Sequence, residues 1–162
     1  MMERIPEPIR PLLAEYIKLI TTMLSGWVDA VYIQGSIALD AFNERSSDVD
    51  FLTLVGRQAT ESEMELLREI HRRLEHKYAR WPLEGSYLPW SDVGETGSAI
   101  SPHPNYHEGL LKRDERAGVN AISWWILKNR GITLMGAAAD KLALNVDWDT
   151  LLIEMKQNLN TY

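Results

Sequence analysis

The stretch Val31-Tyr32-Ile33-Gln34-Gly35-Ser36 is followed, eleven residues later, by Asp48-Val49-Asp50-Phe51-Leu52-Thr53-Leu54-Val55. The first segment is an apolar run that ends in a Gly-Ser pair, and the second is an apolar run that begins with two aspartates. This pattern predicts two strands, at 28–34 and 48–55. Because side chains alternate across a strand, Asp48 and Asp50 project from the same face.

Two carboxylates side by side at the start of an apolar strand repel each other and are costly to desolvate. A divalent cation removes that cost, and Mg²⁺ prefers one or two carboxylates together with substrate phosphates. Gly35 permits a tight turn and a close approach of the backbone. Ser36 then opens a short segment whose amide groups and hydroxyl are suited to holding a phosphate. The sequence therefore predicts a phosphate cradle that faces a metal-binding carboxylate pair.

These residues resemble the nucleotidyltransferase superfamily that includes DNA polymerase beta. Its pattern is Gly-Ser, about a dozen residues, Asp-x-Asp on the next strand, and a third acidic residue on a later strand. From about Val28 onward the chain is similar to the N-terminal domain of the aminoglycoside adenylyltransferases that modify streptomycin and spectinomycin. The segments that carry this closer similarity are 127–140, with its helix, glycine, short strand and small residues, and 145–148 with the helix after it.

The resemblance implies an α/β (α+β) nucleotidyltransferase fold, with a small, mixed, twisted sheet packed against helices. It implies that Asp48 and Asp50 bind Mg²⁺, as one or two ions, and that ATP is a substrate. Gly35, Ser36 and Ser47 would hold the triphosphate. The third carboxylate falls at Glu84, which would either deprotonate the substrate hydroxyl or complete a second metal site.

The resemblance also leaves the acceptor open. The resistance enzymes have a second, helical domain, whereas this sequence ends at Tyr162, so residues 1–162 are expected to form one nucleotidyltransferase domain with that helical domain absent or truncated. The first hypothesis is transfer of AMP from Mg-ATP to a hydroxyl of a small molecule such as an aminoglycoside. The second is adenylylation of a protein partner, as in some toxin–antitoxin pairs, and the third is a catalytically silent nucleotide-binding module.

Composition narrows these choices. The chain has 162 residues, 45% of them hydrophobic and 25% charged, which is ordinary for a globular protein. Its net charge of −6, without a cluster of Lys and Arg, argues against binding long nucleic acid. The absence of cysteine excludes disulfides and thiolate metal sites. No signal-peptide stretch and no membrane-spanning apolar run occurs, so we expect a cytoplasmic protein.

Apolar periodicity predicts helices at 8–24, behind the capping box of Thr60 and Glu63, at 120–130, and after Asp147. A strand at 81–88 carries Glu84, another lies at 132–135, and 91–105 is expected to be a loop. The last helix has an apolar face that reaches the final residue, which predicts association through that helix. Its expected apolar residues are Trp148, Leu151, Leu152, Met155, Leu159 and Tyr162.

Other signals favour structural roles. His103 and His107 have the spacing of zinc-binding helices, but Pro102 and Pro104 disfavour a helix there. His71 and His76 are expected to be solvated. Trp90 is expected to pack in the core in preference to stacking on a base, and the pair at 124–125 to divide between core and edge. Lys128 and Arg130 are expected to favour the helix end instead of contacting a triphosphate.

Overall fold

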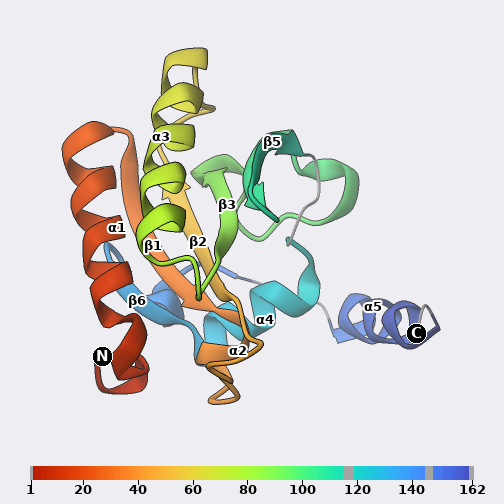
Figure 1. The fold of residues 1–162 in the computed structure, drawn as a ribbon. Coiled ribbons are helices and arrows are strands. Elements are labelled where there is room, and N and C mark those ends of the chain that lie inside the picture. The colour runs from red at the N-terminus through yellow and green to blue at the C-terminus, as the bar shows by residue number, and fades with distance from the viewer. Residues whose placement is uncertain (1, 115–118, 145–147, 161–162) are drawn as a thin grey trace.

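The computed structural model describes residues 2–114, 119–144 and 148–160, which form a six-stranded sheet with helices on both faces (Figure 1). The helices are α1 (Arg10–Met23), α2 (Gly35–Ala38), α3 (Glu61–Lys77), α4 (Ala121–Arg130) and α5 (Trp148–Asn160). The strands are β1 (Val28–Gln34), β2 (Val49–Val55), β3 (Leu83–Pro89), β4 (His103–His107), β5 (Leu110–Asp114) and β6 (Ile132–Met135). Short 3₁₀ turns lie at Met2–Arg4, Glu7–Ile9, Trp90–Asp92, Gly97–Ala99 and Ala139–Lys141.

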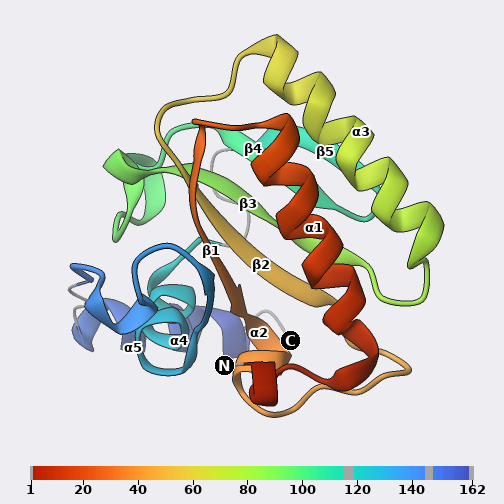
Figure 2. The ribbon, with the colours of Figure 1, turned by 90° about the vertical axis from the view of Figure 1, so that its left-hand side faces the viewer.

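The sheet is mixed and has the strand order β5-β4-β3-β2-β1-β6. Only the β2–β3 pair is parallel, and the other four pairs are antiparallel. The α3 helix provides the crossover that a parallel pair requires. Figure 2 shows α1 and α3 side by side over one face of the twisted sheet. The predicted fold class, a small mixed sheet packed against helices, is therefore confirmed.

The alternation of side chains decides which face of the sheet carries the polar residues. In β1, Val31 and Ile33 belong to the core shared with α1 and α3, whereas Ala30 and Tyr32 belong to a second core shared with α4. The same period of two places the even-numbered residues of β2 and β3 on the α4 side. Asp50 and Glu84 are even-numbered residues of these two central strands, so both carboxylates face that side.

The start of α3 follows the predicted capping box. The Thr60 side chain accepts a hydrogen bond from the Glu63 N–H (3.2 Å), and the Glu63 carboxylate accepts one from the Thr60 N–H (2.8 Å). The Arg57 guanidinium also contacts the Glu63 carboxylate at 2.7 Å. Two of the amide groups that a helix start leaves unpaired are thus satisfied. This fixes the point at which α3 begins to cross the sheet.

The prediction that His71 is solvated is wrong, although His76 is exposed as expected. His71 is 1% exposed, its Nε2 lies 2.7 Å from the Tyr87 hydroxyl, and its ring stacks on Tyr106. Burial lowers the pKa of His71 to about 3. It lies four residues after Leu67 and therefore continues the buried stripe of α3, where a charged ring would be costly.

The prediction of a continuous loop at 91–105 is also wrong, because β4 begins at His103. Two prolines made a strand improbable from sequence. The ladder between β3 and β4 joins only Ser86 to Asn105 and Gly85 to Tyr106, so Pro104 lies beyond its end. The β4–β5 hairpin that follows was not predicted.

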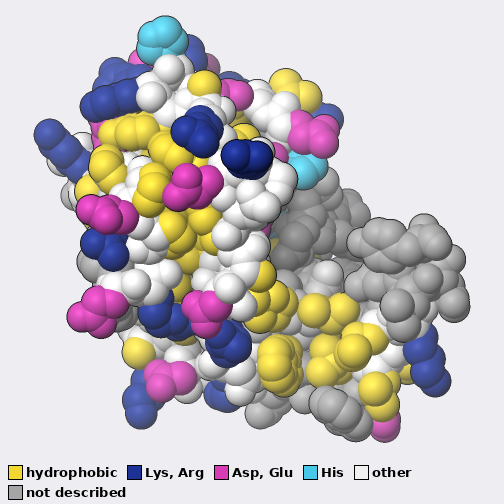
Figure 3. Space-filling model, turned by 60° about the horizontal axis from the view of Figure 1, so that its bottom comes forward, with side chains coloured by type: hydrophobic (Ala, Val, Ile, Leu, Met, Phe, Trp, Pro, Cys, Tyr) yellow, Lys and Arg dark blue, Asp and Glu magenta, His cyan; other side chains and the backbone are white. Residues whose placement is uncertain are grey.

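The apolar face of α5 is partly exposed. Leu151 is buried, but Leu152, Ile153 and Met155 are 37%, 56% and 46% exposed. Figure 3 shows hydrophobic side chains gathered on the face that lies at the bottom of Figure 1. The expected cap Asp147, Tyr162 and the side chains of Trp148 and Leu159 lie outside what the structure describes, and association through this helix remains a prediction. None of the described helices is both long and apolar enough to cross a membrane.

Gly85 allows β3 to approach β2 closely. A Cβ at this position would lie 2.1 Å from the Phe51 carbonyl oxygen and 2.7 Å from the Phe51 Cγ. We expect Gly85→Ala to lower the free energy of unfolding by about 2–3 kcal/mol through overpacking, as measured by urea denaturation. Gly56→Ala is the matched control, because its Cβ would meet nothing closer than 3.8 Å. Equal stabilities of the two variants would contradict this prediction.

Candidate functional site

One row of paired residues crosses five strands and carries four polar side chains of the site. Gln34 pairs with Asp50, Asp50 with Glu84, and His107 with Leu110, while the β3–β4 register continues from Glu84 to His107. Side chains that lie directly opposite one another in a sheet point to the same face. All five residues line a cavity of about 710 Å³.

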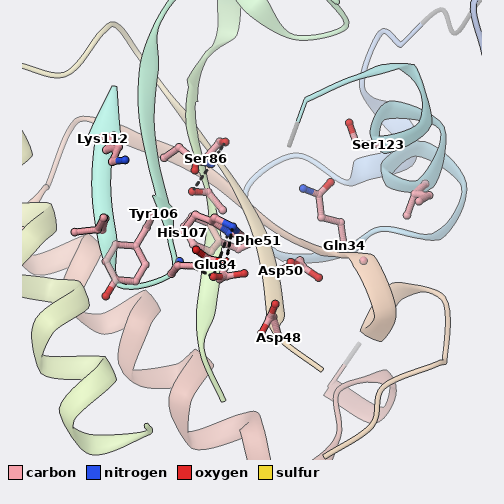
Figure 4. Close-up of a pocket in the computed structure, with 16 residues that line it drawn as sticks. Gln34, Asp48, Asp50, Phe51, Glu84, Ser86, Tyr106, His107, Lys112 and Ser123 are labelled. Carbon is pink, nitrogen blue, oxygen red and sulfur yellow. Dashed lines mark hydrogen bonds and ion pairs between the residues drawn. The ribbon is translucent and has the colours of Figure 1, made fainter. Parts of the chain in front are cut away.

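Asp48 joins this row because it precedes β2 and lies two positions before Asp50. Figure 4 shows Asp48, Asp50 and Glu84 together at the floor of the cavity. Glu84 is only 9% exposed, and the neighbouring Asp48 contributes to its raised pKa. The fold thus brings together the three acidic residues that the sequence identified.

The electrostatics of the three carboxylates reflect their crowding. Burial, followed by the charges of Asp48 and Glu84, raises the pKa of Asp50 to about 6. Burial also raises the pKa of Glu84, as does the neighbouring Asp48, although the Glu108 N–H and the nearby His107 oppose the rise. Without a cation, ionising all three carboxylates at the same time near neutral pH therefore costs free energy.

The donor set fits Mg²⁺. Among the described residues, no three His, Asp or Glu side chains form a complete, ready-made metal site. Mg²⁺ does not need one, since it is commonly bound by one or two carboxylates while water and substrate phosphates complete its octahedron. Asp48 and Asp50 supply that partial set, and the charge of Asp48 contributes to the raised pKa of Asp50.

Gly35 is required by the approach of β1 to Asp50. Its φ is +67°, and a Cβ there would lie 2.1 Å from the Asp50 Oδ2. The chain enters α2 directly at this residue, as the predicted tight turn requires. The Ser36 hydroxyl that follows is buried and has no hydrogen-bond partner among the described residues. A buried hydroxyl without a partner is costly, and a phosphate oxygen would satisfy it.

Ser47 has a structural partner. Its hydroxyl accepts a hydrogen bond from the Asn43 N–H (2.9 Å), and its own N–H donates to the Asn43 carbonyl (2.8 Å). These bonds close the turn between α2 and β2. The cavity lining includes Gly35 but neither Ser36 nor Ser47, so the structure gathers four of the six predicted site residues around one open space.

The far half of the cavity is formed by residues that sequence reasoning missed. Asn105 is 9% exposed and donates hydrogen bonds to the Gly85 carbonyl (3.2 Å) and the Ser86 hydroxyl (2.8 Å). Its two N–H groups are thereby used, which leaves the amide oxygen as the group available to a ligand. Lys112, paired with Asn105 across the hairpin, also lines this half.

His107 and Glu108 were missed as well. The His107 Nδ1 lies 3.2 Å from the Glu84 Oε2, and the Glu108 N–H donates to the same oxygen (2.8 Å). The two-residue turn Glu108-Gly109 has φ values of +51° and +78°, as a type I′ hairpin needs. The Glu-Gly pair between Tyr106-His107 and Leu110-Leu111 was the signal available in the sequence. The four-residue spacing of His103 and His107 does not belong to a zinc-binding helix. The buried His103 contacts Ser86 and the carbonyl of residue 101.

Several weaker expectations can now be judged. Trp90 is not in the core: it is 39% exposed, and its indole N–H donates to Asp29 (2.8 Å), because Pro89 ends β3 and turns the chain outward. Trp124 and Trp125 divide between core and surface as predicted, with 2% and 41% exposure. Lys128 and Arg130 have protein partners, the carbonyl of residue 142 at 3.2 Å and the carboxylate of residue 40 at 2.5 Å.

A solved structure of another protein has a fold similar to that of this chain. Spectinomycin adenyltransferase AAD(9) from Enterococcus faecialis, crystallised with ATP and spectinomycin, matches 92% of this chain with a TM-score of 0.67 and 16% identity. The match covers 66% of that protein, so this chain spans just under two thirds of its length. A toxin–antitoxin structure with AMP-PNP matches 91% of this chain and 89% of its own, with 14% identity and a TM-score of 0.44.

The MntA-HpeT toxin–antitoxin matches over the same shares, at 13% identity and a TM-score of 0.44. No protein-family model matches the sequence, and no curated protein matches it. The likeness to the adenyltransferase shows that this chain has the nucleotidyltransferase fold, as its sequence predicted.

Proposed function

We propose that this chain transfers AMP from Mg-ATP to a hydroxyl group of a small molecule. The observation that carries the proposal is the row of carboxylates, Asp48, Asp50 and Glu84, beside the Gly35 turn in one cavity of this fold. Crowded carboxylates with raised pKa values are typical of sites that act on a metal-bound phosphate. A solely structural role would not place three of them around a cavity of this size.

In this proposal, the phosphates and the acceptor lie on opposite sides of Asp50. Gly35 and the unpartnered Ser36 hydroxyl hold the β- and γ-phosphates, which leave as pyrophosphate. In an in-line displacement the attacking oxygen approaches opposite the leaving group. The acceptor therefore lies on the other side of Asp50, over β3, β4 and β5, where Asn105 and Lys112 line the cavity.

In the reaction, the acceptor oxygen forms a bond to the α-phosphorus, and the bond to the bridging oxygen of pyrophosphate breaks. Glu84 accepts the hydroxyl proton, and its raised pKa suits a base that works near neutral pH. Asp48 and Asp50 hold Mg²⁺, which when bound neutralises charge on the attacking and leaving oxygens. Positioning and charge neutralisation supply most of the catalysis.

An aminoglycoside is the acceptor class that we propose. The fold likeness to an adenyltransferase crystallised with spectinomycin supports this choice. The chain's net charge of −6 and the acidic groups around the cavity, with Glu108 at the rim, also favour a cationic acceptor.

Calorimetric titration with ATP is the first test. We expect binding that requires Mg²⁺, that disappears when the metal is chelated, and that Asp50→Asn weakens at least about tenfold, the loss of one charged ligand. Release of pyrophosphate on addition of spectinomycin or streptomycin would then identify the acceptor. Binding of ATP that is the same with and without Mg²⁺, or the same in Asp50→Asn, would exclude the proposed site.

A further inference from the structure

Glu84 is held from outside the carboxylate cluster by the turn between β4 and β5. The His107 Nδ1 lies 3.2 Å from the Glu84 Oε2, and the Glu108 N–H donates to that same oxygen at 2.8 Å. Glu84 belongs to β3, His107 ends β4 and Glu108 lies in the turn that follows, and Figure 4 shows the imidazole directly beside the Glu84 carboxylate. The hydrogen bond from Glu108 and the contact with His107 both fall on Oε2, which restrains the rotation of the carboxyl group.

We propose that His107 is a positioning residue for the transfer reaction, which holds Glu84 so that its second oxygen, Oε1, is directed to the acceptor hydroxyl. This inference rests on the proposed function, in which Glu84 accepts the acceptor proton. A base must lie within hydrogen-bond reach of the proton that it removes, and an unrestrained carboxylate would lose that orientation. Because His107 and the Glu108 N–H both lie on Oε2, we assign Oε1 to the acceptor hydroxyl.

The backbone of the turn supports this role. Glu108 adopts a φ of +51°, which is uncommon for a residue other than glycine. That conformation, continued by Gly109, directs the Glu108 N–H back toward Glu84. The Glu108 side chain is 81% exposed and makes no closer contact than 3.6 Å to His107. The positive φ that the type I′ turn needs thus also places the Glu108 N–H where it donates a hydrogen bond to Glu84.

The proposal also fixes the histidine tautomer. A carboxylate oxygen only accepts hydrogen bonds, so a His107 that holds Glu84 in this way carries a proton on Nδ1. Long-range nitrogen–proton NMR spectra in alkaline solution, where a histidine carries a single ring proton, distinguish the two tautomers. We expect His107 to be protonated at Nδ1 in the wild type and to revert in Glu84→Ala to the spectrum of the exposed His76. A His107 spectrum that is unchanged in Glu84→Ala would overturn the proposal.

Turnover provides the second measurement. We expect His107→Ala to lower kcat about 10- to 50-fold, the loss of one hydrogen bond to a charged group, with the KM for Mg-ATP within about twofold of wild type. His107→Asn should recover most of this loss, because its amide nitrogen takes nearly the place of Nδ1. His76→Ala, at an exposed position, is the control and should leave both constants unchanged.

The outcomes separate the two proposals. A wild type that transfers nothing to any acceptor contradicts the proposed function, while the NMR result still decides whether His107 holds Glu84. An active wild type whose His107→Ala variant keeps its kcat overturns the positioning role alone. The same applies if His107→Asn is as impaired as His107→Ala, because the donated hydrogen bond would then not be the cause.

Discussion

Replacing Asp50 with asparagine is expected to lower the rate of AMP transfer at least about 1,000-fold, the loss of several kcal/mol of charge stabilisation. The side chain keeps its shape, so the fold is expected to remain intact. The variant loses one of the two carboxylate charges, on Asp48 and Asp50, that we propose bind Mg²⁺. Pyrophosphate release at saturating Mg-ATP measures the effect. An Asp50→Asn variant that is active would contradict the mechanism.

The same change is expected to stabilise the metal-free protein. Folding raises the pKa of Asp50 from 3.8 to about 6, because the side chain is buried beside Asp48 and Glu84. The folded state therefore binds a proton that the unfolded state releases, so stability falls as the pH rises from about 4 to 6 and stays low above it. Asparagine does not titrate and avoids a cost of roughly 2–3 kcal/mol at pH 7.

Thermal denaturation at several pH values tests this expectation. Without metal, Asp50→Asn should melt above the wild type at pH 7 and at the same temperature near pH 4. Added Mg²⁺ should raise the melting temperature of the wild type only. Asp140→Asn, at an exposed position outside the cavity, is the control and should change neither stability nor activity. A variant that is less stable than the wild type at pH 7 would show that the buried charge is not unfavourable.

This opposition between the proposed function and stability explains why the sequence could predict that the two aspartates lie together. Asp48 and Asp50 break the apolar pattern of a strand at a place where carboxylates are costly, and such a break needs a chemical reason. The period of two then places both on one face, and the register across β2 and β3 adds Glu84. Local pattern predicted that Asp48 and Asp50 share a face, the family resemblance pointed to Glu84, and the structure places all three around one cavity.

The acceptor half of the cavity could not be predicted in the same way. Asn105, His107 and Lys112 come together only because β4 pairs with β3 on one side and with β5 on the other. Pro104 within β4 opposed a strand assignment, and the sequence offers no local sign of which strand pairs with which. His71 was also predicted wrongly from sequence. Because it is polar, it was expected to be exposed, although it lies on the buried stripe of α3.

The sequence predicts that Gly35 forms a tight turn, but only the structure shows why a glycine is required there. Gly35→Ala is expected to abolish Mg²⁺-dependent ATP binding within the range of calorimetry. A Cβ would lie 2.1 Å from Asp50 Oδ2 and 2.8 Å from Asp50 Cγ, so the carboxylate must move away from the metal position. The φ of +67° adds about 1–2 kcal/mol of backbone strain.

Gly26→Ala separates the two causes. Gly26 has a φ of +82°, so alanine there meets the same backbone strain, but its Cβ would find no atom within 4 Å. We expect this variant to lose about 1–2 kcal/mol of stability and to bind Mg-ATP like the wild type. If Gly35→Ala bound as well as Gly26→Ala, the contact between β1 and Asp50 would not be what shapes the site. If only Gly35→Ala lost binding, the cause would be the contact of the added Cβ with the Asp50 carboxylate, and not the backbone strain that both variants share.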